Sequence, residues 1–464
     1  MSQTLAEPAD SAGEGTFVRY PGLMRELLKL AAPVLAEHVL HIFVGLNDTY
    51  LANHLPKSNV EAATAVGNIG YIFWFLGLFA GAIATGSTAI IAREIGARHR
   101  RRANSAVGQS MLFAAMIGLA LGVVALFLAK PIVSTMGLSG IADKFAFDYL
   151  RLLAPAAPFV IVMFVANACL RGAGDTRTPA IAMIIVDIVN VVFSWGLTWG
   201  WWGMPAMGFN GIAVGTLIAY IAGGVIQVCV LLAGRGGIQL HLHRLRPHWQ
   251  DMQRIIRIGL PAGITDGVNW GANFALVQVV NRTPPINVAS AAHINTVRIE
   301  SLSYMTGFAV SIAVATMVGQ SLGMKDPRRA ARCAYLGFAA GGGFMLLMGL
   351  MFILFGHALA AAMVTDQEVL RLTARCLQIT GFCQFAFASA IVFGGALRGA
   401  GDTMAVMLIT MVTMLIVRFG GVMVLAHYRQ PLPVIWVLLA SDLTIRGIII
   451  YGRFLHGGWK KIRV

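Results

Sequence analysis

Charged residues are scarce in this sequence of 464 residues. Asp, Glu, Lys and Arg make up 12% of the chain and hydrophobic residues make up 57%, whereas an average soluble domain carries about 25% charged residues. Such a composition leaves too few polar side chains to cover a water-exposed surface. We therefore expect a polytopic membrane protein.

Cysteine is also scarce, and motifs for metal or enzyme chemistry are missing. The sequence has no HExxH motif and no Ser-His or Asp-Asp pair in a catalytic context, so we expect neither an enzyme nor a cofactor. No filter-like loop is repeated, which disfavours a channel. The first 20 residues are polar, and we expect no cleavable signal peptide.

The cysteines are odd in number and lack CxxC spacing, which argues against disulfides and a zinc site. They are Cys169, Cys229, Cys333, Cys376 and Cys383.

Twelve segments are long and apolar enough to cross the hydrocarbon core, which takes about 20 residues of helix. They divide evenly between the two halves of the chain. The predicted spans are 27–52, 62–91, 107–129, 146–170, 179–201, 211–233, 254–280, 288–318, 334–356, 373–397, 403–425 and 434–454.

Basic residues gather at alternate connections between these spans. By the positive-inside rule these loops and both termini are cytoplasmic, in a protein of the inner (plasma) membrane. The net charge of +15 then reflects topology and attraction to anionic lipid instead of nucleic-acid binding, because no basic domain with interleaved aromatic residues accompanies it. The residues concerned are Arg98, Arg100, Arg101, Arg102, Arg171, Arg177, Arg244, Arg246, Arg328, Arg329, Arg332, Lys460, Lys461 and Arg463.

The two halves of the chain repeat each other. The motif LRGAGDT begins at Leu170 and again at Leu397, which gives an offset of 397 − 170 = 227, and Gly96 and Gly323 have the same offset. Each half holds six spans, an even number, so both halves enter the membrane in the same orientation. We predict an all-α fold of two parallel six-helix bundles that face each other across a cleft and open alternately to either side.

This layout divides the chain into five segments, and we expect it to act as a monomer in the bilayer. The segments are a cytoplasmic tail 1–25, an N-lobe 26–234, a cytoplasmic linker 235–252, a C-lobe 253–456 and a cytoplasmic tail 457–464.

Both LRGAGDT copies follow an apolar span and predict a tight turn. Two glycines in each copy, Gly172 and Gly174 or Gly399 and Gly401, permit the turn. Asp175 or Asp402 can then cap the next helix through its side chain. Thr178 followed by Pro179 offers a second cap in the first copy. These features indicate a structural hairpin, with a contribution to gating as the alternative.

Taken together, these motifs resemble the multidrug and toxic compound extrusion (MATE) family. The resemblance runs from "LLKLAAPVLAEHVLHIFVGLNDTYLA" through both LRGAGDT copies and includes "NVASAAHINTVRIESLSYMTGFAVSIAVATMVGQSLGMKDPRRAA". It implies export of small-molecule drugs and other amphipathic, often cationic compounds in exchange for H+ or Na+. A lipid-linked precursor flippase of the same superfamily is the alternative; such proteins usually have more spans and a strongly basic cavity, whereas the intramembrane residues here are mainly acidic.

The resemblance gives Asp48 a role in cation coupling. A charge at mid-bilayer costs about 2.5–3.5 kcal/mol on insertion scales, and Asp48 matches the first-span aspartate that many bacterial and archaeal members use for coupling. A carboxylate that loses hydration binds a proton more readily. The alternative is a helix cap or an interhelical hydrogen bond. Pro33 removes one backbone hydrogen bond from the same span, where we predict a hinge.

The fifth span departs from the family pattern Asn-x-x-Asn-x-x-x-Asp. Asn190 aligns with its second asparagine, which places Asp187 at the first asparagine and Ser194 at the aspartate. Asp187 and Asn190 are three residues apart and share a helix face. Asp187 either replaces the missing carboxylate or is a buried structural residue.

The second half departs from the NorM-like branch, where two carboxylates bind Na+. The aligned positions are Asn269 and Phe387, so the resemblance favours H+ as the coupling ion, with Na+ as the alternative. Asp266, Arg298 and Glu300 remain as ionisable residues. They either form an ion pair, from Arg298 to Asp266 or Glu300, or build a second coupling or substrate-gating site.

A further group of ionisable residues lies in the last two spans. Arg418, Asp442 and Arg446 are expected to pair with one another, because unpaired charges are costly in the membrane.

Overall fold

The computed structural model describes residues 22–462 except 57, 243–244 and 246. The basic residues Arg244, Arg246 and Arg463, and most of the predicted tail 1–25, lie outside the described residues. The long helices are α1 (Leu23–Asn53), α2 (Asn59–Gly96), α3 (Arg100–Phe127), α5 (Ile141–Leu153), α6 (Ala157–Ala173), α7 (Arg177–Trp199), α8 (Phe209–Leu232), α9 (Trp249–Val280), α10 (Ile286–Gly323), α11 (Pro327–Ala361), α12 (Gln367–Gly399), α13 (Thr403–Val412), α14 (Gly421–His427) and α15 (Leu432–His456).

Short elements complete two of the spans and join others. The 3₁₀ turn η1 (Ala154–Ala156) joins α5 to α6, and the π-helical segment η5 (Thr413–Gly420) joins α13 to α14. The remaining short elements are α4 (Ala129–Ser134), η2 (Trp201–Gly203), η3 (Arg235–Gly237) and η6 (Gly458–Lys461).

The described residues form helices and no strands, which confirms the predicted all-α fold. Among them, eleven helical segments are long and apolar enough to span a membrane. Helix α9 makes the twelfth segment; it is less apolar because Asp266, Asn269 and Asn273 lie in its middle. The helices extend beyond most of the predicted spans, because several of their first and last turns are polar and project past the apolar core.

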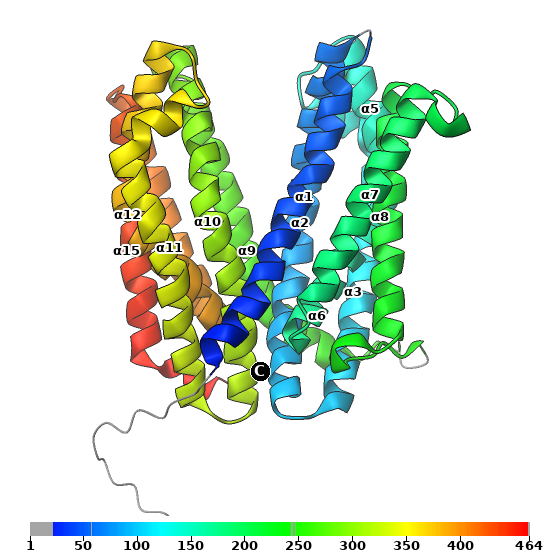
Figure 1. Cartoon of the computed structure of the whole chain (residues 1–464), viewed down its shortest axis with the longest axis vertical. Helices are drawn as coiled ribbons and strands as arrows, with labels where there is room; N and C mark the ends of the chain where they lie inside the picture. Colours follow the sequence, from blue (N-terminus) through cyan, green and yellow to red (C-terminus); the bar gives the residue numbers. More distant parts are fainter. Residues whose placement is uncertain (1–21, 57, 243–244, 246, 463–464) are drawn as a thin grey trace, which may run out of the picture.

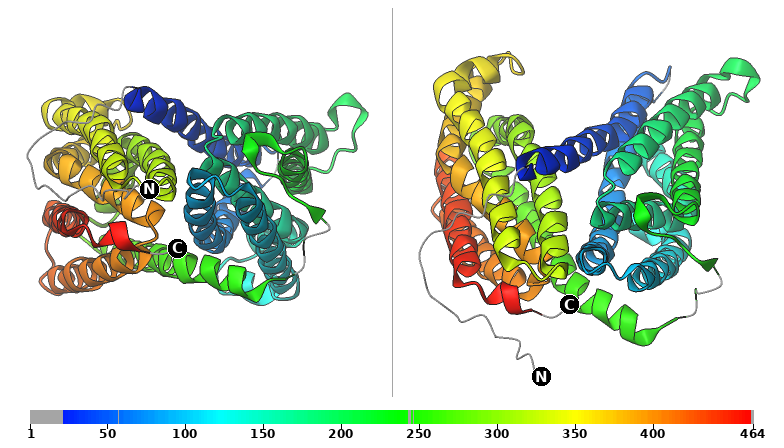
Figure 2. Two further views of the ribbon diagram at one scale, coloured as in Figure 1. Left: turned by 90° about the horizontal axis from the view of Figure 1, so that it is seen from below. Right: turned by 60° about the horizontal axis from the view of Figure 1, so that its bottom comes forward.

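The helices form two bundles that converge at one end and diverge at the other (Figure 1). Helices α1–α8 make the first bundle and α9–α15 the second. The end where the bundles meet holds the α2–α3 turn around Arg98 and the α10–α11 turn around Lys325; we call it the closed end. Seen from that end, α9 runs along one side from the first bundle to the second (Figure 2).

Glycines allow α2 and α10 to cross at the closed end with their backbones in contact. A Cβ on Gly96 would overlap the backbone of Gln320, and a Cβ on Gly323 would overlap the backbone of Arg93. The two contacts are equivalent under the sequence offset, since 96 + 227 = 323 and 93 + 227 = 320. Such a reciprocal contact is the signature of a two-fold relation between parallel repeats.

The glycines of the two LRGAGDT copies have two different roles. Gly174 and Gly401 adopt positive φ angles of 96° and 88° and make the turns. The prediction that Gly172 and Gly399 also belong to the turn is wrong, because each lies in its helix and permits close packing. A Cβ on Gly172 would come within 3.0 Å of the Thr88 carbonyl oxygen.

Of the predicted caps, only the one by Asp175 in the first copy is confirmed. The Asp175 carboxylate accepts hydrogen bonds from the backbone amides of Arg177 and Thr178, at 3.2 and 3.0 Å. Thr178 is therefore already in the first turn of α7 and is not a second cap. The capping prediction for Asp402 is also wrong, because its carboxylate binds Arg453 at 2.9 Å instead.

Substitution of Gly96 or Gly323 by alanine should destabilise the closed end to the same extent, because the two positions are equivalent. The added methyl group would meet backbone that cannot move without shifting a whole helix, and we expect a loss of about 1–3 kcal/mol in stability. Thermal unfolding of the purified variants measures this.

Gly343→Ala in α11 is the matched control, because a Cβ there meets nothing within 4 Å. It should be neutral or stabilising by up to about 1 kcal/mol. Equal melting temperatures for all three variants would contradict the packing described at the crossing.

Candidate cation and substrate site

A buried carboxylate lies inside the first bundle. Asp48 of α1 is 3% exposed. The hydroxyl groups of Tyr149 in α5 and Thr216 in α8 each donate a hydrogen bond of 2.7 Å to its Oδ2. Three helices therefore converge on one oxygen atom of this side chain.

The Asn190 amide of α7 completes the network around Asp48. Its Nδ2 lies 3.4 Å from Asp48 Oδ1, 2.9 Å from Thr216 Oγ1 and 3.3 Å from Ser194 Oγ. Its Oδ1 accepts a hydrogen bond of 2.8 Å from Asn47. Asn190 and Ser194 are both fully buried, so the structure brings Asp48, Asn190 and Ser194 together in one site.

The partners of Asp48 are all neutral. Within the described part of the chain, no Lys or Arg forms an ion pair with Asp48, although a buried charge is normally paired. A carboxylate held only by neutral donors can take up a proton or a cation without first losing an ionic partner. This arrangement suits reversible cation binding.

Asp187 lies close to this network but does not join it. It is half-buried, and both of its carboxylate oxygens are buried without a hydrogen-bond partner among the described residues. Tyr220 of α8 interacts electrostatically with both Asp48 and Asp187, so the two carboxylates belong to the same region of the bundle. Because a buried acceptor needs a partner, Asp187 has a free position for a proton, a water molecule or a cationic group.

Helix α1 connects this region to the second bundle. Before Pro33, Leu23, Leu27 and Leu30 pack into a core made by α10, α11 and α12, and Glu26 forms a 3.0 Å ion pair with Arg329. After Pro33, the helix packs into the first bundle, where Val44 is buried among α6, α7 and α8. Pro33 therefore lies where α1 passes from one bundle to the other (Figure 1).

The first LRGAGDT copy holds α1 on both sides of Pro33. Proline lacks the amide that would bond the carbonyl four residues earlier, and that carbonyl, of Lys29, accepts a long hydrogen bond of 3.5 Å from Thr176. Four residues after the proline, the Glu37 carboxylate is bound by Arg171 at 2.8 and 2.9 Å. The part of α1 around Pro33 is thus attached to the repeated motif.

The predicted residues of the second half do not form one site. Glu300 is buried and accepts hydrogen bonds from Thr380 at 2.6 Å and Gln384 at 3.0 Å. Asp266 lies where α9 meets α2, because a Cβ on Gly81 would be 3.4 Å from its Oδ2. The predicted ion pair of Arg298 with Asp266 or Glu300 is wrong among the described residues, because the Arg298 side chain is exposed and forms no ion pair with either carboxylate.

The expected pairing of Arg418, Asp442 and Arg446 is confirmed. Asp442 Oδ2 accepts hydrogen bonds from Arg418 at 2.9 Å and from Arg446 at 2.6 Å. Another nitrogen of the Arg446 guanidinium group reaches α9, where it lies 3.5 Å from Asn269 Oδ1. The position that carries a carboxylate in the NorM-like branch therefore faces a positive charge here.

Sequence analysis missed Tyr149 and Thr216. Each is one of several polar residues in its helix, and they lie 101 and 168 residues from Asp48 in the chain. No local motif marks either one, and only the packing of α5 and α8 against α1 shows their role.

Comparison with known proteins gives a consistent result along the whole chain. The model of the MatE family matches twice, over residues 33–195 and 261–423, and the two matches start 261 − 33 = 228 residues apart, close to the offset of the internal repeat. A probable multidrug resistance protein, NorM of Thermotoga maritima, is 30% identical over 447 residues, which cover 95% of this chain and 94% of that protein.

Two solved structures have the same overall fold as this chain. A crystal structure of a MATE protein in its bent conformation has a TM-score of 0.86 at 20% identity, covering 95% of this chain and 98% of that one. An outward-facing multidrug resistance MATE family transporter has a TM-score of 0.85 at 20% identity, with coverage of 95% and 98%. At this level of identity the likeness supports the fold alone.

Thr216→Val should destabilise the first bundle by about 1–3 kcal/mol, because it leaves a buried carboxylate without one donor and the Asn190 amide without one acceptor. Valine keeps the shape of the side chain, so the change reports the hydrogen bonds. Thermal unfolding in detergent measures the effect.

Thr64→Val is the control, since the exposed Thr64 hydroxyl bonds only a carbonyl of its own helix, at 2.7 Å. It should change stability by no more than about 0.5 kcal/mol. A Thr216→Val protein as stable as the control would mean that this network does not hold the helices together.

Proposed function

Because the chain belongs to the MatE family of membrane transporters, we propose that it is a multidrug efflux antiporter. It exports amphipathic, often cationic organic compounds and takes up H+ in return. Its relatives support the drug substrates, since the Thermotoga maritima protein is named a probable multidrug resistance protein. The coupling ion is inferred from the site.

The orientation follows from the distribution of positive charge. The turns at the closed end carry two groups of arginines, Arg98 and Arg100–Arg102 in the first bundle and Arg328, Arg329 and Arg332 in the second. By the positive-inside rule this end faces the cytoplasm, in the plasma membrane, with both termini on the same side. The bundles then diverge towards the outside, which corresponds to the state that releases drug and admits protons.

The observation that carries the proposal is the buried Asp48 carboxylate with neutral partners only. When it is charged, it attracts a cationic drug into the first bundle; when it binds a proton, that attraction disappears. Asp48 can bind either a proton or a cationic drug, but not both at once. Binding of one therefore favours release of the other, which is the basis of exchange. Asp187, with its unpartnered oxygens, adds a second position for positive charge nearby.

Helix α1 is the element through which the site can act on the bundles. Asp48 lies beyond Pro33 in the part of α1 packed in the first bundle, while the part before Pro33 packs against the second. A change of charge at Asp48 alters the interactions between the first bundle and the part of α1 that follows Pro33. Bending at Pro33 would then transmit this change to the contact between the bundles.

The surroundings favour H+ over Na+. Sodium needs several hard oxygen ligands, as other hard cations do, whereas a proton needs one carboxylate. The hydroxyls around Asp48 act as donors to it, and in the second bundle Asn269 faces the Arg446 guanidinium. A sodium ion at Asp48 would first have to displace these hydroxyl protons from the carboxylate, whereas a proton would not.

Asp48→Asn should abolish drug export, because the amide cannot bind and release a proton. Cells that express the variant should lose resistance to ethidium and norfloxacin, and the protein should still fold because the amide can hydrogen-bond in place of the carboxylate. Drug susceptibility together with membrane expression measures this.

Asp143→Asn makes the same chemical change in the first turn of α5, away from the Asp48 network. It should leave resistance unchanged. Full resistance with Asp48→Asn would make Asp48 a structural residue.

Proteoliposomes separate the two coupling ions. Ethidium transport should follow an imposed pH gradient at equal Na+ on both sides, and should stop when a protonophore is added. Transport driven by a Na+ gradient at zero pH gradient, and insensitive to the protonophore, would identify a Na+-coupled antiporter instead.

A further inference from the structure

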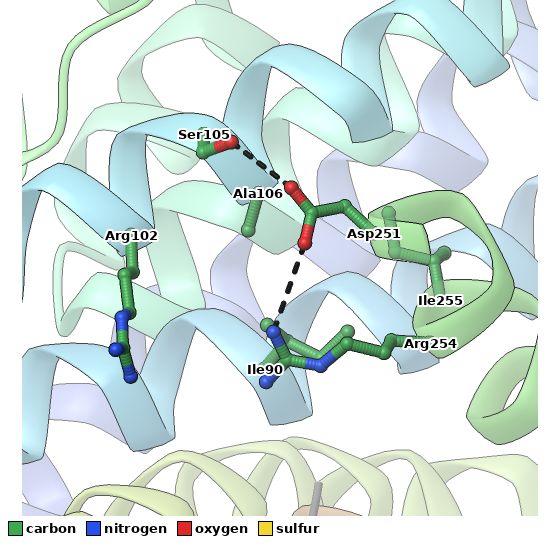
Figure 3. Close-up of a pocket in the computed structure, with 7 residues that line it drawn as sticks. All are labelled: Ile90, Arg102, Ser105, Ala106, Asp251, Arg254 and Ile255. Carbon is green, nitrogen blue, oxygen red and sulfur yellow. Dashed lines mark hydrogen bonds and ion pairs between the residues drawn. The ribbon is translucent and has the colours of Figure 1, made fainter. Parts of the chain in front are cut away.

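A hollow of about 160 Å³ lies near the closed end, where α2 and α3 of the first bundle meet α9 of the second. Figure 3 shows its lining side chains. It is separate from the region of Asp48, which lies in the other half of the membrane by its position in α1. Nothing in the proposed transport cycle uses it.

Two guanidinium groups line the hollow from different helices. Arg102 of α3 is exposed and makes no ion pair with any described residue, and Arg254 of α9 lies opposite it (Figure 3). Arg254 also forms ion pairs with Glu94 at 3.5 Å and Asp251 at 3.8 Å. Guanidinium groups bind phosphate through paired N–H donors.

Two carboxylates lie at the hollow, Asp251 in its lining and Glu94 beside Arg254. Asp251 accepts a hydrogen bond of 3.1 Å from Ser105 and lies beside Arg254 (Figure 3). Four further basic residues, Arg98, Arg100, Arg101 and Arg257, occur in the adjoining turn and on α9. The local charge is therefore positive.

The remaining walls of the hollow are apolar. They come from Ile90 of α2, Ala106 of α3 and Ile255 of α9. A space lined by both guanidinium groups and aliphatic side chains matches a molecule with an anionic head and an apolar body.

The outer face of α9 places the hollow at the depth of lipid headgroups. Trp249, Arg257 and Leu260 succeed one another on its exposed face, with Trp249 64% and Leu260 56% exposed. Tryptophan and arginine followed by aliphatic residues are typical of a helix that enters the hydrocarbon core. Arg254 lies one turn before that entry point.

We propose that this hollow binds the phosphate group of an anionic phospholipid, with Arg102 and Arg254 as its ligands. Basic pockets between helices at the cytoplasmic face suit such headgroups. Arg102 belongs to α3, and Arg254 to the first part of α9, which packs against the first bundle through Ile255 and Ile258 before α9 continues into the second bundle. One lipid therefore links α3 to the helix that joins the two bundles in this conformation. A ligand that binds one state selectively stabilises that state by mass action. Anionic lipid therefore favours the state in which this end is closed.

The test uses the purified full-length protein in neutral detergent, titrated with phosphatidylglycerol or phosphatidylcholine while thermal unfolding is followed. Phosphatidylglycerol should raise the melting temperature of the wild-type protein more than phosphatidylcholine does. Arg102→Gln should weaken the effect of phosphatidylglycerol about fivefold in apparent affinity, as expected for loss of one basic contact near the surface. Arg102 is exposed, so the variant should fold normally.

Arg101→Gln is the matched control, because it removes the same charge one residue away and does not line the hollow. It should keep the wild-type response to phosphatidylglycerol. Equal losses in both variants would mean general surface attraction and would overturn the proposal, as would equal responses to the two lipids. Inorganic phosphate is the third arm: if it alone reproduces the shift, the hollow binds free phosphate and not a lipid.

Discussion

The structure of the first bundle depends on one buried carboxylate that has only neutral partners. Asp48 collects donors from α5, α7 and α8, so it fixes the relative positions of four helices. A buried charge without a counter-ion is costly, and the donors around it offset only part of that cost. The site is therefore stable with a proton or a cation bound and strained without one. We propose that this difference couples occupancy of the site to the conformation of the helices.

Two further features carry the effect of this site to the contact between the bundles. Helix α1 belongs to the second bundle before Pro33 and to the first after it, so it cannot change its bend without altering the contact between them. At the closed end, Gly96 and Gly323 let α2 and α10 touch backbone to backbone. A small separation of the helices removes this contact entirely. The closed state therefore differs sharply from a state in which this end is open.

The fold could be predicted from the sequence because its signals are long and repeated: apolar spans of about 20 residues and a motif that recurs at a constant offset. Asp48, Asn190 and Ser194 could be placed together through the family resemblance. Tyr149 and Thr216 could not, because their role arises from helix packing over 101 and 168 residues of separation. The ion pair expected for Arg298 was wrong because helical phase, and not nearness in sequence, decides which side chains face inward. Asp402 was assigned as a cap by analogy with Asp175, but Arg453 of the last helix, which has no equivalent contact in the first half, binds it.

The central claim is that drug and proton compete for Asp48, and proton release on drug binding tests it most directly. Purified protein in weakly buffered solution is mixed with ethidium, and a pH indicator reports any protons released. The account predicts release by the wild-type protein and none by Asp48→Asn under the same conditions. Equal release by both proteins, or ethidium binding to the wild-type protein without release, would contradict it.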